Sequence, residues 1–239
     1  MTTNSEMIGL WNSPASASWA TRPERYDAML SELGERLLRV AAPTPEERVL
    51  DVGCGAGQLS ALAAELVGPT GQVLGVDVAV DLLAVAAFAN LLATTTPGGR
   101  LAFVAWQAAP LNEWMTLPLG AVVPHLGFPE LPAPGAPGPF AFADLAALQD
   151  LLADAGWAGV QVEDVQTTVS VGGARTAQQA VDFLTEDTFG QMLLGKADPT
   201  SRSAALTALF DAYAERVADG ALRLKAAVWL VTAHRPAQA

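Results

Sequence analysis

The stretch VLDVGCGAGQ, residues 49–58, constrains the fold of this chain more than any other part of the sequence. A short apolar run ends in a loop that carries Gly53, Gly55 and Gly57, and the helical pattern LSALAAEL follows. Glycine admits backbone angles that other residues resist and lets a ligand touch the main chain. A helix that begins here would direct its free N–H groups at the same ligand. A second apolar run, GQVLGVDV, lies at 71–78. Together they predict a βαβ unit with a right-handed crossover.

The glycine spacing indicates which ligand this loop accepts. A dinucleotide-binding loop reads G-x-G-x-x-G, whereas here the third glycine comes one residue early and position 58 is Gln58. Asp51 precedes the loop, and its carboxylate would repel phosphate but attract an ammonium group. Asp77, at the end of the second strand, can accept both hydroxyls of a ribose, or it can simply cap a helix. The loop therefore favours a nucleoside with an amino-acid end and disfavours a nicotinamide-dependent dehydrogenase.

Little chain separates the second strand from the third. One helix, at about 81–95, and the turn Pro97-Gly98-Gly99 lead to the strand RLAFVAW at 100–106. Upstream, Thr21 and Pro23 predict the start of a helix that continues to residue 41. The patterns beyond Gln107 predict a long Pro/Gly-rich irregular loop over 108–139, a helix at 143–155, a strand at 160–171, helical segments over 176–219 and a last strand at 225–234.

These segments resemble class I S-adenosylmethionine-dependent methyltransferases. VLDVGCGAGQLS and GQVLGVDV resemble their motifs I and II. PGGRLAFVAW resembles the turn that follows a helix in these enzymes, together with their fifth strand. WNSPASASWATRPERYDAML and LVTAHRP resemble the ubiquinone/menaquinone-biosynthesis-like (UbiE-type) small-molecule branch. The resemblance implies an α/β, Rossmann-like methyltransferase sheet that is mostly parallel with an antiparallel last strand, together with a helical arm and a helical cap.

The resemblance also implies that this sheet is shortened. The family's strand order is 3-2-1-4-5-7-6, and the residues present account for strands 1, 2, 5, 6 and 7, so strands 3 and 4 are expected to be lacking. Strand 5 could then pair directly with strand 1, or two chains could associate to cover the gap. The expected division is an arm and helix at 1–46 and a shortened domain at 47–239, in which 172–222 is a helical cap insertion.

The implied cofactor is S-adenosylmethionine. By resemblance, Asp51 and the glycine loop would hold its methionine part, Asp77 its ribose, and Val78 would pack beside its adenine. Cys54 is interpreted as a small side chain beside the ligand and not as a redox group. The full set of expected cofactor-binding residues is Asp51, Gly53, Cys54, Gly55, Gly57, Gln58, Asp77 and Val78.

The acceptor side carries weaker signals. Aromatic side chains in the arm and at the end of the third strand could contact a substrate, or could equally be core residues: Trp11, Trp19, Tyr26 and Trp106. Arg22 and His125 are weighed as further candidates, with ordinary surface roles favoured. No catalytic residue is identified, and methyl transfer needs little beyond alignment of the reacting groups. The predicted function is methyl transfer to a small, apolar acceptor. The alternative is a non-catalytic S-adenosylmethionine-fold binding protein or partner subunit, so enzymatic activity stays open.

Composition limits the partners. A net charge of −12 repels phosphate backbones, which argues against nucleic acid. One cysteine and two distant histidines exclude an intramolecular disulfide and a Cys/His zinc cluster, so no metal is expected. No run approaches the roughly 18 apolar residues that span a bilayer, and the first ten residues do not resemble a secretion signal. A small-molecule substrate, a cytoplasmic location and no membrane span are therefore expected, and a homodimer is left open.

Overall fold

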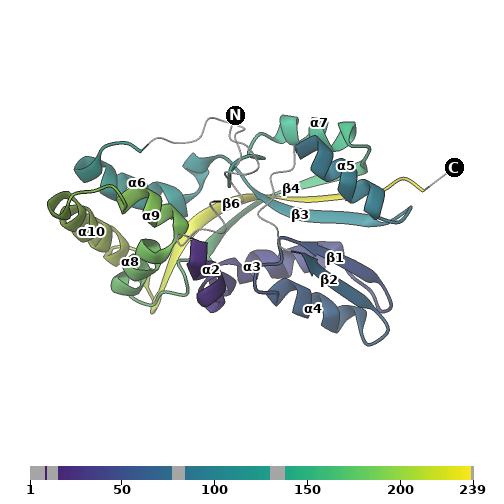
Figure 1. Cartoon of the computed structure of the whole chain (residues 1–239), viewed down its shortest axis with the longest axis horizontal. Coiled ribbons are helices and arrows are strands. Elements are labelled where there is room, and N and C mark those ends of the chain that lie inside the picture. Colours follow the sequence, from purple (N-terminus) through teal and green to yellow (C-terminus); the bar gives the residue numbers. More distant parts are fainter. Residues whose placement is uncertain (1–8, 10–15, 77–83, 130–137, 238–239) are drawn as a thin grey trace.

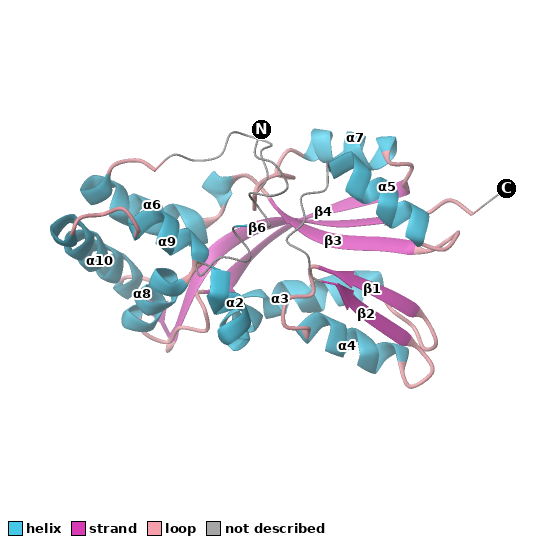
Figure 2. Ribbon diagram, viewed as in Figure 1, coloured by secondary structure: helices cyan, strands magenta, loops and turns pink. Residues whose placement is uncertain are grey.

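The computed structural model describes residues 9, 16–76, 84–129 and 138–237. The main strands in this part of the chain form two separate sheets (Figures 1 and 2). In the first, β1 (Arg48–Val52) pairs in parallel with β2 (Gln72–Val76). In the second, β6 (Ala221–His234) lies between β3 (Arg100–Trp106) and β4 (Ala158–Ser170) and is antiparallel to both. A short β5 (Val217–Ala218) forms a hairpin with the start of β6. The antiparallel last strand is thus present, between the two strands where the resemblance places it.

The described residues do not close the gap between the two sheets. β1 pairs only with β2, and β3 pairs only with β6, so the hypothesis of direct pairing between strands 1 and 5 is wrong for this structure. Paired strands lie about 4.8 Å apart. Here β1 and β3 instead line one cleft, joined at one end by an ion pair of 2.7 Å between Arg100 and Glu47. Arg100 also donates to the carbonyl of Ala41, so the side chains at this end set the spacing.

Helices cover both faces of the second sheet. α3 (Pro23–Ala41) packs on one face, and α5 (Ala84–Thr94) and α7 (Leu145–Asp154) lie on the other (Figure 1). Val228 of β6 is buried with residues of α3, whereas Val231 is buried with residues of α5 and α7. Alternation along a strand places successive side chains on opposite faces, which explains this division. α4 (Gln58–Val67) packs against β1 and β2.

The arm differs from its predicted capping. Thr21 does not cap α3 because it is the last residue of a separate short helix, α2 (Ala17–Thr21). Arg22 interrupts the helical path with a φ of −138°, and α3 then begins at Pro23. Proline suits this position because its missing N–H would have no partner in the first turn.

The predicted irregular loop over 108–139 is wrong for residues 109–126. A 3₁₀ turn, η2 (Ala109–Leu111), leads into α6 (Glu113–Leu126), although this helix contains Pro118 and Pro124. Proline removes a backbone hydrogen bond, so local preference disfavours the helix. Packing overrides that preference, because Pro118 and Val122 are buried and α6 lies against α10 (Pro199–Ala214).

Three helices stand between β4 and β6. They are α8 (Ala177–Glu186), α9 (Thr188–Leu194) and α10, and they gather with α6 at one end of the molecule (Figure 1). The predicted helical segments over 176–219 are confirmed up to Ala214, whereas Val217–Ala218 form β5 and not a helix. A core cluster that includes Leu209 and Tyr213 joins these helices to Tyr26 of α3, so they are packed against the arm.

Candidate functional site

The loop after β1 has the backbone that its glycines predict. Gly53, Gly55 and Gly57 have φ angles of 80°, 52° and 91°, all in the left-handed region that other residues rarely adopt. A Cβ placed on any of the three would meet no described atom within 4 Å. Glycine is therefore required here by backbone conformation, and no described residue fills the space in front of the loop.

The loop is fastened to the end of β2. The amides of Gly53 and Cys54 donate to the carbonyl of Val76 at 2.8 and 3.3 Å, and the amide of Gly57 donates to that of Cys54 at 2.8 Å. α4 begins at Gln58 without a side-chain cap. The first N–H groups of a helix lack intrahelical partners, so they are suited to bind an anionic or carbonyl group.

Asp51 is half-buried on β1, directly before this loop. Its Oδ2 accepts a hydrogen bond of 2.6 Å from the hydroxyl of Ser60 on α4. This contact fixes the carboxylate while Asp51 still lines the cleft. The arrangement can hold a cationic group at the edge of the glycine loop.

One cleft of about 1600 Å³ brings together most of the predicted residues that the structure describes, although Gly57 is not among its lining residues. Its wall includes Asp51, the loop from Gly53 to Ala56, and Gln58. Trp19, Tyr26 and Trp106, the predicted acceptor residues that the structure describes, line the same cleft. Asp77, Val78 and Trp11 lie outside the described residues. Arg22 and His125 are not among the lining residues, and His125 is exposed on α6.

The predicted acceptor residues take part in two separate sets of aromatic contacts. Trp19 stacks on Tyr26 with ring centroids 3.7 Å apart and an interplanar angle of 17°. Trp106 contacts Trp114 at 5.0 Å, and Trp114 stacks on Phe140 at 5.7 Å. Such pairs contribute beyond their buried area, and Trp19, Tyr26 and Trp106 supply aromatic side chains to the wall of the cleft.

Sequence reasoning missed two polar residues behind this wall. The hydroxyl of Tyr26 lies 2.6 Å from that of Ser18 and donates to Oδ1 of Asp187 at 3.1 Å. Burial raises the pKa of Tyr26 and also raises the pKa of the Asp187 carboxyl. Asp187 could have been found as the cap before the helical pattern at 188–194, but no sequence signal links it to Tyr26.

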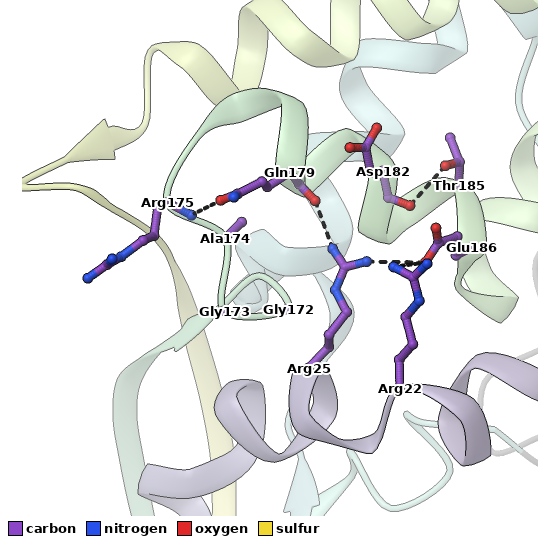
Figure 3. A pocket seen from close by; sticks show the side chains of 10 residues that line it. All are labelled: Arg22, Arg25, Gly172, Gly173, Ala174, Arg175, Gln179, Asp182, Thr185 and Glu186. Atoms are coloured by element: carbon purple, nitrogen blue, oxygen red, sulfur yellow. Dashed lines mark hydrogen bonds and ion pairs between the residues drawn. The ribbon is translucent and has the colours of Figure 1, made fainter.

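A second, smaller pocket of about 500 Å³ lies between the arm and α8 (Figure 3). Arg22 and Arg25 both point at Glu186, at 3.2 and 3.1 Å, and Arg25 also donates to the carbonyl of Gln179 at 2.9 Å. These cations are already paired, so we interpret this pocket as the interlock between α3 and α8 and not as a ligand site.

No group of three His, Cys, Asp or Glu side chains among the described residues is placed to hold a metal ion. No helix in the described part is long and apolar enough to cross a membrane.

Comparison with known proteins agrees with the geometry of the loop. Residues 43–94 match the family model of a methyltransferase domain. Over 115 residues the chain is 38% identical to nocamycin O-methyltransferase of Saccharothrix syringae. This alignment covers 45% of this chain and 40% of that protein. Over 44 residues it is 48% identical to 2-phytyl-1,4-naphtoquinone methyltransferase of Synechocystis, which covers 18% of each. The matched segments thus span well under half of these relatives.

Solved structures give more distant likenesses. Phosphoethanolamine N-methyltransferase 2 of Haemonchus contortus, in complex with S-adenosyl-L-methionine, aligns with a TM-score of 0.48 and 13% identity over 96% of this chain and 60% of that one. A methyltransferase of Bacillus halodurans aligns with a TM-score of 0.45 and 15% identity over 85% and 98%. The sequence matches confirm the resemblance to class I S-adenosylmethionine-dependent methyltransferases, and with it the class of cofactor that the resemblance implies.

Proposed function

We propose that this protein is a methyltransferase of the UbiE-like branch. It would bind S-adenosylmethionine in the cleft beside β1 and transfer the methyl group to a small, apolar acceptor. The observation that carries this proposal is the shared cleft. The open glycine loop and Asp51 stand on one part of its wall, and the aromatic residues Trp19, Tyr26 and Trp106 stand on another. A cofactor site and an apolar acceptor site would therefore adjoin.

The residues present fit this cofactor. Three left-handed glycines leave open space where side chains would project. Asp51 would hold the ammonium group of the methionine part, Gln58 would stand at the start of α4, and Asp77 and Val78 would contact ribose and adenine. When bound, this cofactor would supply a methyl group on a sulfonium, which a nucleophilic atom of the acceptor would take while the electron pair of the carbon–sulfur bond stayed on sulfur.

The chain's own contribution is alignment and exclusion of water. Holding two reactants in line accounts for several orders of magnitude in rate without a catalytic base. The aromatic wall would keep an apolar acceptor in contact with the loop. The helices within 172–222 would act as the cap, with 1–46 as the arm and 47–239 as the domain.

A specific observation favours the second candidate, a non-catalytic binding protein or partner subunit. The edge of β1 that faces the cleft has no strand partner among the described residues, and Leu50 and Val52, which line the cleft, are 44% and 57% exposed. Apolar side chains at an open edge are a typical site of association with another chain. A homodimer or a partner protein would cover them. Nucleic acid stays a disfavoured partner, and the cytoplasmic location stays a prediction.

Calorimetric titration of S-adenosylhomocysteine tests the proposal. We expect binding by the wild-type protein. Asp51→Asn keeps the side chain's shape but removes its charge. Charge-assisted hydrogen bonds contribute about 1.5–3 kcal/mol, so we expect affinity to fall by about 10-fold to 100-fold. Glu65→Gln, an equal charge change on the exposed side of α4, is the matched control and should bind normally.

The outcomes separate the two candidates. Binding that is lost in Asp51→Asn, together with methyl transfer to small apolar acceptors, supports the enzyme. Binding without transfer to any acceptor tested favours the binding protein. No binding by the folded wild-type protein would reject both roles for the loop.

A further inference from the structure

The carboxylate of Asp51 is held from behind the wall of the cleft. Asp51 lines the cleft, whereas Ser60 is not among the lining residues. The Ser60 hydroxyl donates to Oδ2 of Asp51 at 2.6 Å, a distance typical of a hydroxyl that donates to an ionised carboxylate. Among the residues that the structure describes, Oδ1 of Asp51 accepts no hydrogen bond and joins no ion pair. One oxygen is therefore used inside the protein, and the other can accept from a ligand.

The direction of the Ser60 hydroxyl follows from the packing of α4. This helix contacts both β1 and β2, and Ser60 is its third residue. A serine inside a helix often turns its hydroxyl back onto a carbonyl group of the same helix. Here the hydroxyl donates across to the strand instead, so the position of α4 on the sheet fixes one oxygen of the Asp51 carboxylate.

Gly75 leaves the room that this contact needs. It lies directly opposite Asp51 in the register of β1 and β2. A Cβ built on Gly75 would lie 2.9 Å from the hydroxyl oxygen of Ser60 and 3.0 Å from the sulfur of Cys54. The φ of Gly75 is not positive, so its backbone conformation does not require glycine. The space taken by the two neighbouring side chains does.

A fixed carboxylate differs from a free one in what it can bind. When one oxygen is held, the other keeps a single direction, and a ligand does not have to order the side chain on binding. Without the hydroxyl, the Asp51 side chain would gain rotational freedom that a bound ammonium group must then remove. The contact between Ser60 and Asp51 should therefore matter for ligands that carry a cation, and not for those that lack one.

We propose that Ser60 is a positioning residue that directs the Asp51 carboxylate at the ammonium group of the cofactor, and that Gly75 keeps the room for its hydroxyl. Neither residue lines the cleft, so both act through Asp51. The inference rests on the proposed function, because it requires S-adenosylmethionine to bind in this cleft. It goes further by assigning selectivity for the amino-acid end of the ligand to two residues behind the wall.

The test compares two ligands that differ in one group. S-adenosylhomocysteine carries the ammonium group, and its deaminated analogue has a hydrogen atom in that place. Binding of each ligand to the full chain is measured by calorimetry. We expect the wild-type protein to bind S-adenosylhomocysteine about tenfold more tightly than the analogue, as a charge-assisted hydrogen bond implies. Ser60→Ala should weaken S-adenosylhomocysteine binding by about fivefold and leave binding of the analogue unchanged.

Gly75→Ala tests the room for the hydroxyl. Its methyl group would displace the Ser60 hydroxyl, so we expect the same selective loss as in Ser60→Ala. Because both changes act on one contact, adding Gly75→Ala to Ser60→Ala should cause no further loss of the preference. Ser203→Ala, at an exposed position of α10, is the matched control and should keep the wild-type preference.

A second pair of variants separates the hydroxyl from the size of the side chain. Ser60→Thr and Ser60→Val introduce side chains of the same shape, but only threonine keeps a hydroxyl that can donate to Asp51. The threonine variant should bind S-adenosylhomocysteine about fivefold more tightly than the valine variant, while the two bind the analogue equally. A purely structural role of position 60 would affect both ligands alike.

The outcomes distinguish failure of this inference from failure of the proposed function. Equal weakening of both ligands in Ser60→Ala, or no weakening of S-adenosylhomocysteine, overturns the positioning role. An independent loss of preference from Gly75→Ala in the Ser60→Ala background overturns the role of Gly75. If Gly75→Ala does not fold, the Ser60 variants still decide. Equal affinity of the wild-type protein for the two ligands overturns the inference but leaves the cofactor site intact. Absence of S-adenosylhomocysteine binding by the wild-type protein refutes the cofactor site itself.

Discussion

Replacement of Gly55 by alanine isolates the cost of the glycine loop's backbone. Gly55 has a φ of 52°, and an added Cβ would meet no described atom within 4 Å. The described atoms therefore cause no steric crowding, and we expect the effect to come from the left-handed conformation. An L-residue in that region costs about 1–2 kcal/mol, so we expect Gly55→Ala to lower the free energy of unfolding by this amount.

Gly120 provides the matched control. It is exposed within α6, an added Cβ there also meets no described atom within 4 Å, and its φ is not positive. Glycine inside a helix is less stable than alanine by about 0.5–1 kcal/mol, so Gly120→Ala should raise the free energy of unfolding. The same chemical change is thus expected to have opposite signs at the two positions.

Urea unfolding followed by circular dichroism measures both variants. The two midpoints should move in opposite directions, and the slopes should stay equal if only stability has changed. Gly55→Ala should also weaken S-adenosylhomocysteine binding, because its Cβ projects into the open space in front of the loop. Equal shifts of the two midpoints, or a Gly55→Ala variant as stable as wild type, would refute the conformational argument.

Two further predictions concern burial and charge. Leu152 of α7 is 0% exposed, so Leu152→Ala should lower the free energy of unfolding by about 2–5 kcal/mol. Leu74 of β2 is 62% exposed, so Leu74→Ala should lower it by less than about 1 kcal/mol. Similar shifts in the thermal midpoints of the two variants would contradict this difference in burial. The hydrogen bond from Arg100 lowers the pKa of Glu47 from its usual 4.5. A carboxyl with a lowered folded-state pKa contributes stability above pH 4.5 that is lost as the pH falls through the lower value. Urea midpoints measured from pH 7 down to pH 3 should therefore fall less steeply in Glu47→Gln than in wild type. Glu46→Gln is the control. Parallel curves of urea midpoint against pH for wild type and Glu47→Gln would contradict the role of the ion pair.

The local elements were predictable because their signals are local. The positive φ angles of Gly53, Gly55 and Gly57 follow from the tight turn between a strand and a helix, which the sequence carries within ten residues. The start of α4 and the order of the strands along the chain could likewise be predicted from periodicity and glycine positions. Thr21 was misread as a cap because the break at Arg22 left no pattern in the sequence.

Long-range packing was not predictable in the same way. α6 contains Pro118 and Pro124, and its helical form depends on burial against α10, a segment some 80 residues further along the chain. The contact between Tyr26 and Asp187 joins two elements that are brought together only when the cap packs on the arm. Neither residue type nor spacing indicates such a contact.

The sequence by itself thus determined the βαβ unit, the open glycine loop and the acidic side chain beside it, because backbone sterics and periodicity act over a few residues. Only the tertiary structure decided that β1 and β3 stay apart as the walls of one cleft. It also decided that Trp19, Tyr26 and Trp106 line that cleft with the loop. Pairing of strands and convergence of side chains depend on the balance of packing over the whole chain, and no short stretch encodes that balance.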